Sequence, residues 1–353
     1  MNPKKILIVY QTKPIIDRGL VAAFARLGIE AKTFYADENN HFIDKYLFHF
    51  INKQAHNLRI LKKSRYLFTE HPLSHRYWMA KQFLKTVQEF QPDLVFAIQG
   101  PVLDLATLQQ VKAPKIAWWV EPESQMAKMP EVAKSYDWYF CFSRYGLKLL
   151  EDSGIKHCSY LAHAVDRASF FPVPKASKRW DVAFVGKHSA HREAMIMAAL
   201  SVTNKVAVYG PRWLGACLRN PKLLQAYRGS SCYGTQLNRL YSASKIVLNA
   251  IAHQQQGKVS SGMNMRPYEV LASGSLLVSD EYQETESGLV SGKNCIFYQS
   301  AQELQTQLKD LLDNPKKLTK IADAGHQFLA DQFSYDAMAK EILDKYALIT
   351  AKH

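Results

Sequence analysis

The stretch that decides the fold reads Ser244-Lys-Ile-Val-Leu-Asn249, then a loop, then Asn264-Met-Arg-Pro-Tyr-Glu269-Val-Leu-Ala-Ser-Gly274-Ser-Leu-Leu-Val-Ser-Asp280. Its first apolar run ends at Asn249 and predicts a buried parallel strand. Pro267 suits the first turn of a helix, and Gly274 suits the position just past its end. The run from residue 276 to 278 predicts a second buried strand. We therefore expect a strand–loop–helix–strand unit that opens at the carboxyl edge of a sheet, where open α/β folds bind ligands.

The charged residues of this unit suit a nucleotide. The amino end of a helix offers unpaired N–H groups to a phosphate, and Arg266 adds a planar cation at the same end. Glu269 follows about one turn later, where a carboxylate can accept hydrogen bonds from both hydroxyls of a ribose. The same spacing also fits an ordinary amphipathic helix with solvated Arg266 and Glu269, so the pattern leaves both interpretations open.

Length, composition and charge narrow the class of protein. The 353 residues exceed one ordinary core and predict two domains. No run of about 18 apolar residues is present, and the apolar part of the first strand is too short for a secretory signal. Five cysteines without a Cys-x-x-Cys pair indicate reduced, structural thiols in a cytoplasmic protein. The net charge of +14 indicates an anionic partner (nucleotide, nucleic acid, acidic glycan or lipid headgroup) or serves solubility alone.

The apolar pattern builds two Rossmann-like halves in tandem, residues 1–171 and 180–334, which predicts an α/β protein. The Pro/Lys/Ser-rich segment 172–179 lacks an apolar period and is the expected linker. The first half has no Gly-x-Gly-x-x-Gly fingerprint, so we do not expect it to bind a dinucleotide. Strands are expected at residues 5–10, 29–35, 92–98, 114–120, 136–142, 158–161, 180–185, 205–209, 245–248, 276–278 and 294–298.

Residues 41–90 differ from the rest of the first half. They combine many lysines, arginines and aromatic residues with only three acidic residues, Asp44, Glu70 and Glu89. We expect two or three helices with a basic, aromatic-rich face, which can lie on an anionic membrane surface. The segment also fits a helical layer that covers the sheet and leaves its basic face solvated.

A second candidate for phosphate binding is the turn that follows the strand at 180–185. Gly186 lets the backbone approach a ligand, and Lys187 and Arg192 supply positive charge, although the glycine is also compatible with a tight turn alone. The first and fourth strands of a doubly wound sheet end side by side at the switch point. This turn would therefore meet Glu269 and form a site for a nucleotide diphosphate. No Asp-x-Asp triplet occurs in the chain, which agrees with binding of the diphosphate without a metal.

Three segments carry a resemblance to a known family. They are Asp181-Val-Ala-Phe-Val-Gly186 with Arg192, Leu240-Tyr-Ser-Ala-Ser-Lys-Ile-Val-Leu-Asn249, and Asn264-x-Arg266-x-x-Glu269 with Gly274. Together they resemble the CgeB-type (spore-maturation-protein-like) glycosyltransferases, which belong to the GT-B enzymes with a family-4-like donor domain. The resemblance is specific over residues 181–333. It is looser in the first half, where Trp118-Trp119-Val-Glu121 and residues 161–166 fit in outline.

The resemblance implies the GT-B architecture, in which two Rossmann-like domains face a cleft and a final helix, 335–353, crosses back to the first domain. The second domain would bind a nucleotide sugar, with a UDP-hexose as the expected donor and no cofactor. The first would bind the acceptor, a glycan, a lipid-linked acceptor or a surface polymer. By resemblance, Glu269 takes the ribose, Arg192 takes phosphate, and Asn249, Asn264 and Arg266 line the donor pocket.

The sequence departs from the family pattern at two positions. The wider family-4 group has a second glutamate where this chain has Ser261, and CgeB-type sequences commonly have Asp where this chain has Glu121. Glu121 is our candidate general base, because it ends a strand at the expected cleft; an ion pair or a helix cap would explain it equally. His163 is a candidate assistant, or else a packed histidine. A reaction that retains the anomeric configuration would require no such base.

Two classes of function follow. The first is a cytoplasmic glycosyltransferase, peripheral at the inner face of a membrane, that acts without a metal. The alternative is a non-catalytic module of the same fold that binds a nucleotide sugar or a polyanion, since fold alone does not determine function. A nucleic-acid-binding protein would explain the charge, but none of the usual motifs is present.

Overall fold

Apolar runs separated by helical segments build a parallel sheet in the first part of the chain. The structure is a computed structural model that describes residues 2–12, 15–62, 65–99, 102–121, 123–251, 262–282, 288–329 and 333–351. The sheet has the order β2-β1-β3-β4-β5-β6, with every neighbouring pair parallel. The strands are β1 Lys5–Tyr10, β2 Glu30–Tyr35, β3 Leu94–Ile98, β4 Lys115–Trp119, β5 Trp138–Cys141 and β6 Cys158–Tyr160. All of β3 and most of β1 are buried, as expected for strands of a parallel sheet that helices cover on both faces.

A second parallel sheet follows, with the order β12-β11-β10-β7-β8-β9. The strands are β7 Trp180–Val185, β8 Val206–Tyr209, β9 Tyr227–Gly229, β10 Ser244–Asn249, β11 Leu276–Asp280 and β12 Ile296–Tyr298. The chain begins this sheet at β7, adds β8 and β9 on one side, and then adds β10 to β12 on the other side. The strand order therefore reverses between β7 and β10, which is the switch point of a doubly wound sheet.

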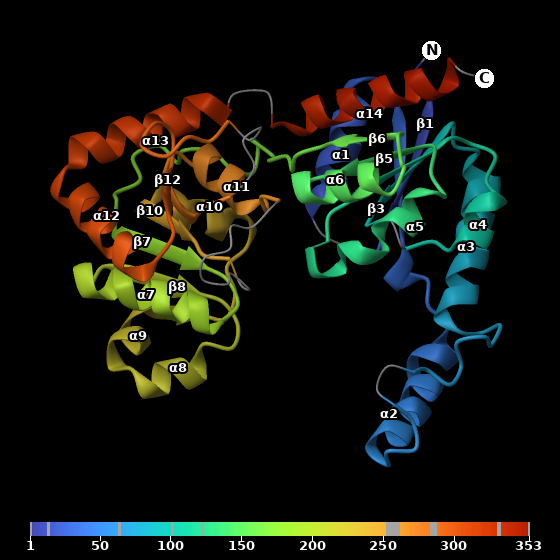
Figure 1. Cartoon of the computed structure of the whole chain (residues 1–353), viewed down its shortest axis with the longest axis horizontal. Helices are drawn as coiled ribbons and strands as arrows, with labels where there is room; N and C mark the ends of the chain where they lie inside the picture. The colour runs from blue at the N-terminus through green and yellow to red at the C-terminus, as the bar shows by residue number, and fades with distance from the viewer. Residues whose placement is uncertain are drawn as a thin grey trace. The chain divides into compact units, whose positions relative to one another are not determined.

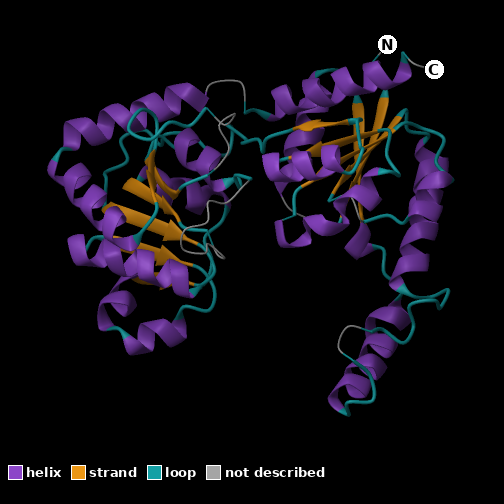
Figure 2. Ribbon diagram, in the orientation of Figure 1, coloured by secondary structure: helices purple, strands orange, loops and turns teal. Residues whose placement is uncertain are grey.

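Helices flank both sheets (Figure 2). In the first half they are α1 Ile15–Arg26, α2 His49–Asn57, α3 His75–Phe90, α4 Leu105–Gln109, α5 Met129–Ala133 and α6 Arg144–Asp152. In the second half they are α7 Ala190–Val202, α8 Leu214–Arg219, α9 Pro221–Ala226, α10 Gly234–Ser242, α11 Arg266–Ala272, α12 Ala301–Asp313 and α13 Pro315–Leu329, with α14 Tyr335–Thr350 at the end. None of the described helices is long and apolar enough to cross a bilayer.

The chain divides into two compact units, Met1–Leu161 with Met338–His353 and Ala162–Ala337 (Figure 1). Most of α14 thus belongs to the first unit, where Lys345 Nζ lies 5.1 Å from the centre of the Trp138 ring. The α/β class with two Rossmann-like units and a returning final helix is confirmed. The division falls before the linker expected at 172–179, because Phe170 already packs against Tyr241 of the second unit.

All eleven strands expected from the sequence are present. The twelfth strand, β9, was not predicted, because its sequence Tyr-Arg-Gly contains no apolar run. The helices α8 and α9 were also missed, because six residues are less than two helical turns and show little periodicity.

Residues 42–74 form what we call the arm. A π-helical turn, Asp44–Phe48, leads directly into α2, and an irregular return segment leads to α3. In Figure 1, α2 stands away from the sheet of the first unit. The expectation of two or three helices in residues 41–90 is confirmed, but α2 does not cover the sheet.

Candidate functional site

The carboxyl ends of β7 and β10 lie side by side, because these strands are neighbours on either side of the switch point. Gly186 follows β7, and the N-cap of α7 is Ser189, whose hydroxyl accepts from the N–H of Arg192 at 3.4 Å. Asn249 ends β10 and is fully buried. The amino end of the 13-residue helix α7 therefore lies at this edge of the sheet, where a helix presents N–H groups that have no partner within the helix.

Glycines bring the backbone segments of this edge close together. Gly210, after β8, has φ of +140°, and a Cβ there would lie 2.0 Å from the carbonyl oxygen of Gly186. A Cβ on Gly186 would lie 2.9 Å from Cζ of Phe184 and 3.3 Å from Nη1 of Arg192. Gly210 thus lets the turn after β8 approach the backbone of Gly186, and the missing side chain at Gly186 leaves room for the Arg192 guanidinium.

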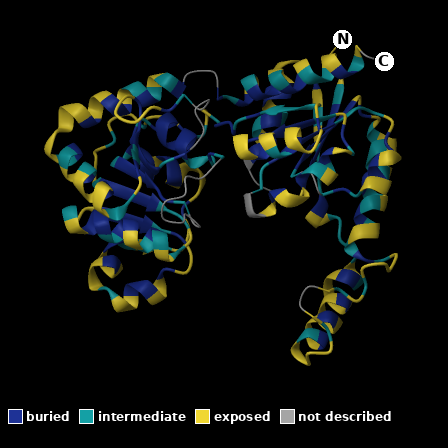
Figure 3. Cartoon of the chain, in the orientation of Figure 1, coloured by how far each residue is buried: buried dark blue, intermediate teal, exposed yellow. Residues whose placement is uncertain are grey.

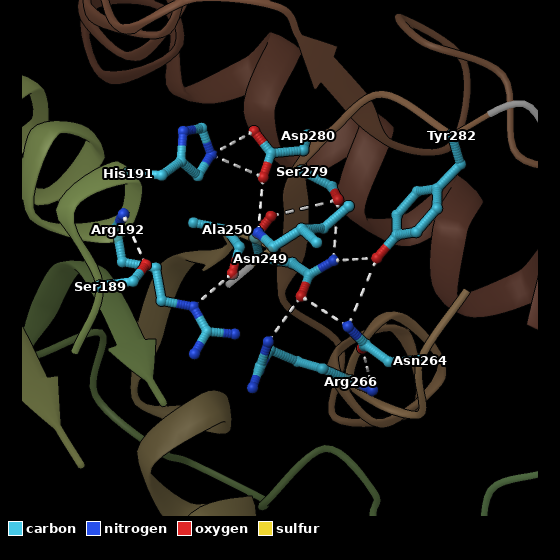
Figure 4. A network of polar contacts seen from close by, with 11 residues as sticks. Ser189, His191, Arg192, Asn249, Ala250, Asn264, Arg266, Ser279, Asp280 and Tyr282 are labelled. Carbon is cyan, nitrogen blue, oxygen red and sulfur yellow. Dashed lines mark hydrogen bonds and ion pairs between the residues drawn. The ribbon is translucent and has the colours of Figure 1, made fainter. Parts of the chain in front are cut away.

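Two arginines share the face of one aromatic ring. The guanidinium carbons of Arg192 and Arg266 lie 5.5 and 5.8 Å from the centre of the Phe184 ring. Arg192 is only 8% exposed and is held by two backbone carbonyls, donating through Nε to Ala250 at 2.7 Å and through Nη1 to Lys187 at 2.9 Å. Figure 4 shows both guanidinium groups extending into the same space.

A chain of amides and hydroxyls positions Arg266. Its Nη1 donates to Oδ1 of Asn249 at 2.6 Å, and its backbone N–H donates to Oδ1 of Asn264 at 3.0 Å (Figure 4). The Nδ2 of Asn249 donates in turn to Tyr282 Oη at 2.7 Å and Ser279 Oγ at 2.9 Å. The structure therefore brings together four residues singled out in the sequence, Arg192, Asn249, Asn264 and Arg266.

The structure adds a carboxylate that sequence reasoning did not assign to the site. Asp280, at the end of β11, accepts from His191 Nε2 at 2.9 Å and from the N–H of Ile251 at 2.6 Å. Its position at the end of a strand beside β10 was the available signal. Asp280 anchors the start of α7 to the backbone that follows β10.

The electrostatics of the arginine pair favour an anion. Burial, together with the charge of Arg266, lowers the pKa of Arg192 to about 10. Within the described ranges, neither guanidinium forms an ion pair with a carboxylate. The nearby Asp280 pairs with His191 instead. Two cations in a partly desolvated site repel each other, and a phosphate between them would relieve the repulsion.

Glu269 lies in the first turns of α11 and is 8% exposed. No described residue donates a hydrogen bond to its carboxylate. Burial raises its pKa to about 7, and the charge of Arg266 opposes this rise. The site thus contains a carboxylate with unused acceptor capacity close to a cation, as a ribose hydroxyl pair would require.

The remaining predicted residues of the second unit are Lys187, His163 and Ser261. Lys187 is exposed and contributes its carbonyl oxygen. His163 is buried, and burial lowers its pKa to about 4, so its imidazole is neutral at physiological pH. Ser261 lies outside the described residues.

Glu121 lies in a pocket of the first unit, at the carboxyl edge of its sheet. Its Oε1 accepts from Gln99 Nε2 at 2.5 Å and its Oε2 from Gln125 Nε2 at 3.2 Å. Gln99 directly follows β3 and has φ of +74°, a conformation that is strained for a residue other than glycine. The polar residues of the lining are Gln11, Asp37, His75, Gln99, Glu121 and Gln125. Glu121 is therefore held by neutral amides in a polar pocket, and its role as a base stays a prediction.

This fold is shared with solved structures of low sequence identity. The Anabaena protein Alr3699/HepE in complex with UDP-glucose has 13% identity and a TM-score of 0.66, with 96% of this chain and 99% of that chain covered. Sucrose-phosphate synthase from Thermosynechococcus elongatus has 13% identity and a TM-score of 0.72, with 99% and 100% covered. A glycosyltransferase from Rickettsia africae has 14% identity and a TM-score of 0.67, with 99% of each chain covered. The chain therefore has the GT-B fold.

The sequence itself gives a narrower match. Residues 190–344 match a family model described as "Glycosyl transferase-like". This range contains Arg192, Asn249, Arg266 and Glu269, all on the second unit. No curated protein matches the sequence.

Proposed function

We propose that the protein is a glycosyltransferase that moves a sugar from a nucleotide-diphosphate sugar to an acceptor hydroxyl. The observation that carries the proposal is the pair of arginines, one of them buried, over Phe184 at the switch point of the second sheet. The match of residues 190–344 to a glycosyltransferase family model supports the same reading. The CgeB-type resemblance is a finer proposal on the same residues.

In the proposed reaction the donor diphosphate lies between the amino end of α7 and the two guanidinium groups. Arg192 and Arg266 neutralise the negative charge that grows on the diphosphate as the sugar–oxygen bond breaks. The Glu269 carboxylate accepts hydrogen bonds from the ribose hydroxyls. We propose a UDP-hexose as donor, because the similar Anabaena structure was crystallised with UDP-glucose.

We propose that these cations stabilise the leaving diphosphate without a metal ion. The experiment is to measure transfer with an excess of EDTA and after magnesium or manganese is added back. Transfer should survive the chelator; activity lost to EDTA and restored by either metal would contradict this part of the proposal.

For the acceptor we propose the pocket of the first unit, with Glu121 as the base that takes the hydroxyl proton. Its carboxylate keeps further acceptor capacity beside the amides of Gln99 and Gln125. The proposed acceptor is a glycan, a lipid-linked acceptor or a surface polymer. We propose that the protein works in the cytoplasm, peripheral at the inner face of a membrane.

The test has two stages. A thermal-shift screen against nucleotides and nucleotide sugars should raise the melting temperature with UDP and a UDP-sugar, because a ligand that binds only the folded state stabilises it. In the second stage the protein is incubated with the UDP-sugar and each member of a glycan panel. UDP should be released only when the correct acceptor is present. Binding without release under any condition would favour the non-catalytic module, and no binding of any nucleotide would refute both functions.

A further inference from the structure

The helix of the arm has one covered face. Asp44, Phe48 and Asn52, spaced at four residues, are buried. Phe48 stacks on Phe68 of the return segment with ring centres 4.0 Å apart, and Tyr66 donates to Oδ1 of Asp44 at 2.7 Å. The arm therefore has a small core of its own, which fixes the orientation of its outer face.

The outer face of the same helix is apolar and exposed. Phe42, Tyr46 and Phe50 repeat at four residues and are 66%, 67% and 59% exposed. Eight of the nineteen exposed large apolar residues of the described chain fall between residues 42 and 67. They are Phe42, Tyr46, Leu47, Phe50, Ile51, Leu58, Ile60 and Leu67. Figure 3 shows the arm as largely exposed. A concentration of this kind marks an interaction surface.

The neighbouring stripe of the helix is basic. It consists of Lys45, His49 and Lys53, again at a spacing of four. Lys45 and His49 directly precede Tyr46 and Phe50 of the apolar stripe in the sequence. Residues 42–67 contain six lysines and arginines and a single acidic residue, Asp44. Asp44 is fully buried, and its Oδ2 lies 3.7 Å from Nδ1 of His49, so among the described residues of this stretch it pairs with a histidine and with none of the lysines or arginines.

Hydrogen-bond donors also border this stripe. A hollow beside α2 is lined by His49, Asn52, Lys53, His56, Asn57 and Tyr66. Asn52 is 3% exposed, and its Nδ2 has no hydrogen-bond partner among the described residues. None of the residues that line the hollow is acidic, so its chemistry suits an anionic group such as a lipid phosphate.

We infer that the arm docks on an anionic membrane, with the stripe of Phe42, Tyr46 and Phe50 inserted at the interface and the stripe of Lys45, His49 and Lys53 on the headgroups. Apolar and basic stripes side by side are what an interfacial helix requires. A second copy of the chain is a poor occupant, because pairing two arms would oppose like charges. The inference gives the proposed peripheral position a structural basis and does not depend on the sugar-transfer reaction.

The experiment is co-sedimentation of the full chain with vesicles of phosphatidylglycerol or of phosphatidylcholine, without any donor. Binding should require phosphatidylglycerol and should fade as salt rises. The double variant K45Q/K53Q should lose roughly thirtyfold in partitioning, since each basic residue contributes about 1 kcal/mol at such a surface. The variant F50S/I60S should also lose binding, whereas its control, L218S, changes an 82% exposed leucine of the second unit and should bind like the parent. The charge control is K316Q/K320Q on α13.

Several outcomes would overturn the inference. Equal pelleting with both lipids, no pelleting, or unchanged pelleting of both arm variants would each do so. Self-association of the parent that F50S/I60S abolishes would instead make the arm a contact between copies. All of these variants should keep the UDP thermal shift of the parent. If UDP does not raise the melting temperature of the parent, the proposed donor binding is refuted, but the vesicle result still holds.

Discussion

Replacing Glu269 with glutamine should stabilise the folded protein while it weakens nucleotide binding. The unfolded chain ionises this carboxyl near its ordinary pKa of 4.5, whereas burial raises the pKa in the folded state to about 7. Between these values the folded state holds a proton that the unfolded state has lost. Stability therefore falls as pH rises from about 4.5 to about 7, and it levels off above that.

The size of the effect follows from the same two values. The shift from 4.5 to about 7 corresponds to about 3 kcal/mol at pH 8. Because the side chain is 8% exposed, solvent screening reduces this value little. Glutamine cannot ionise, so E269Q should avoid the penalty. For a unit of this size the gain equals roughly 6–12 °C in melting temperature.

The assay is a series of melting curves of the parent and E269Q from pH 5 to pH 8, with and without UDP. Without ligand, the variant should gain on the parent as pH rises. UDP should raise the melting temperature of the parent more than that of E269Q, because the amide lacks the charge that strengthens hydrogen bonds from the ribose hydroxyls. The matched control is E151Q, an exposed glutamate on α6, which should follow the parent throughout.

Three results would refute this reasoning. They are equal stability of E269Q and the parent at pH 8, constant stability of the parent between pH 5 and pH 7, and an equal gain of both proteins from UDP. The first two would show that the carboxylate is solvated rather than buried. The third would place the ribose elsewhere.

Three further predictions concern other residues. R192A should weaken UDP binding roughly 10–100-fold in calorimetry, since charged hydrogen bonds contribute about 1.5–3 kcal/mol. The control K187A should change UDP binding little. An equal loss of affinity in both variants would show that the diphosphate does not bind at Arg192. G186A should also weaken UDP binding, because its Cβ would lie 3.3 Å from Nη1 of Arg192, and unchanged affinity would show that the loop yields freely. E121Q should lower the rate of transfer without altering the UDP thermal shift; a full rate would remove Glu121 as the base.

The sequence was sufficient for the order of the elements. Central strands such as β1, β3 and β4 each contain a continuous apolar run, because helices cover both faces of a parallel sheet. Gly274, with φ of +70°, ends α11 as its position predicted. The strand β9 was not predicted because its sequence, Tyr-Arg-Gly, has no apolar run.

The residues of the candidate site also divide into those that the sequence could indicate and those that it could not. Arg192, Asn249 and Glu269 could be nominated from the sequence, since Asn249 ends a strand and the other two lie in the first turn of a helix, at the edge where open sheets bind ligands. Asp280 could not be joined to His191, because 89 positions separate them along the chain and only the pairing of β10 with β7 and β11 brings them together.

The character of two surfaces was also decided only in three dimensions. The chain predicts that residues 41–90 are basic and aromatic, but the packing of Phe48 on Phe68 determines which face of the arm remains exposed. Glu269 is likewise an ordinary carboxyl in the sequence. Its altered pKa exists only after folding, because water is removed by residues that lie far from it in the chain.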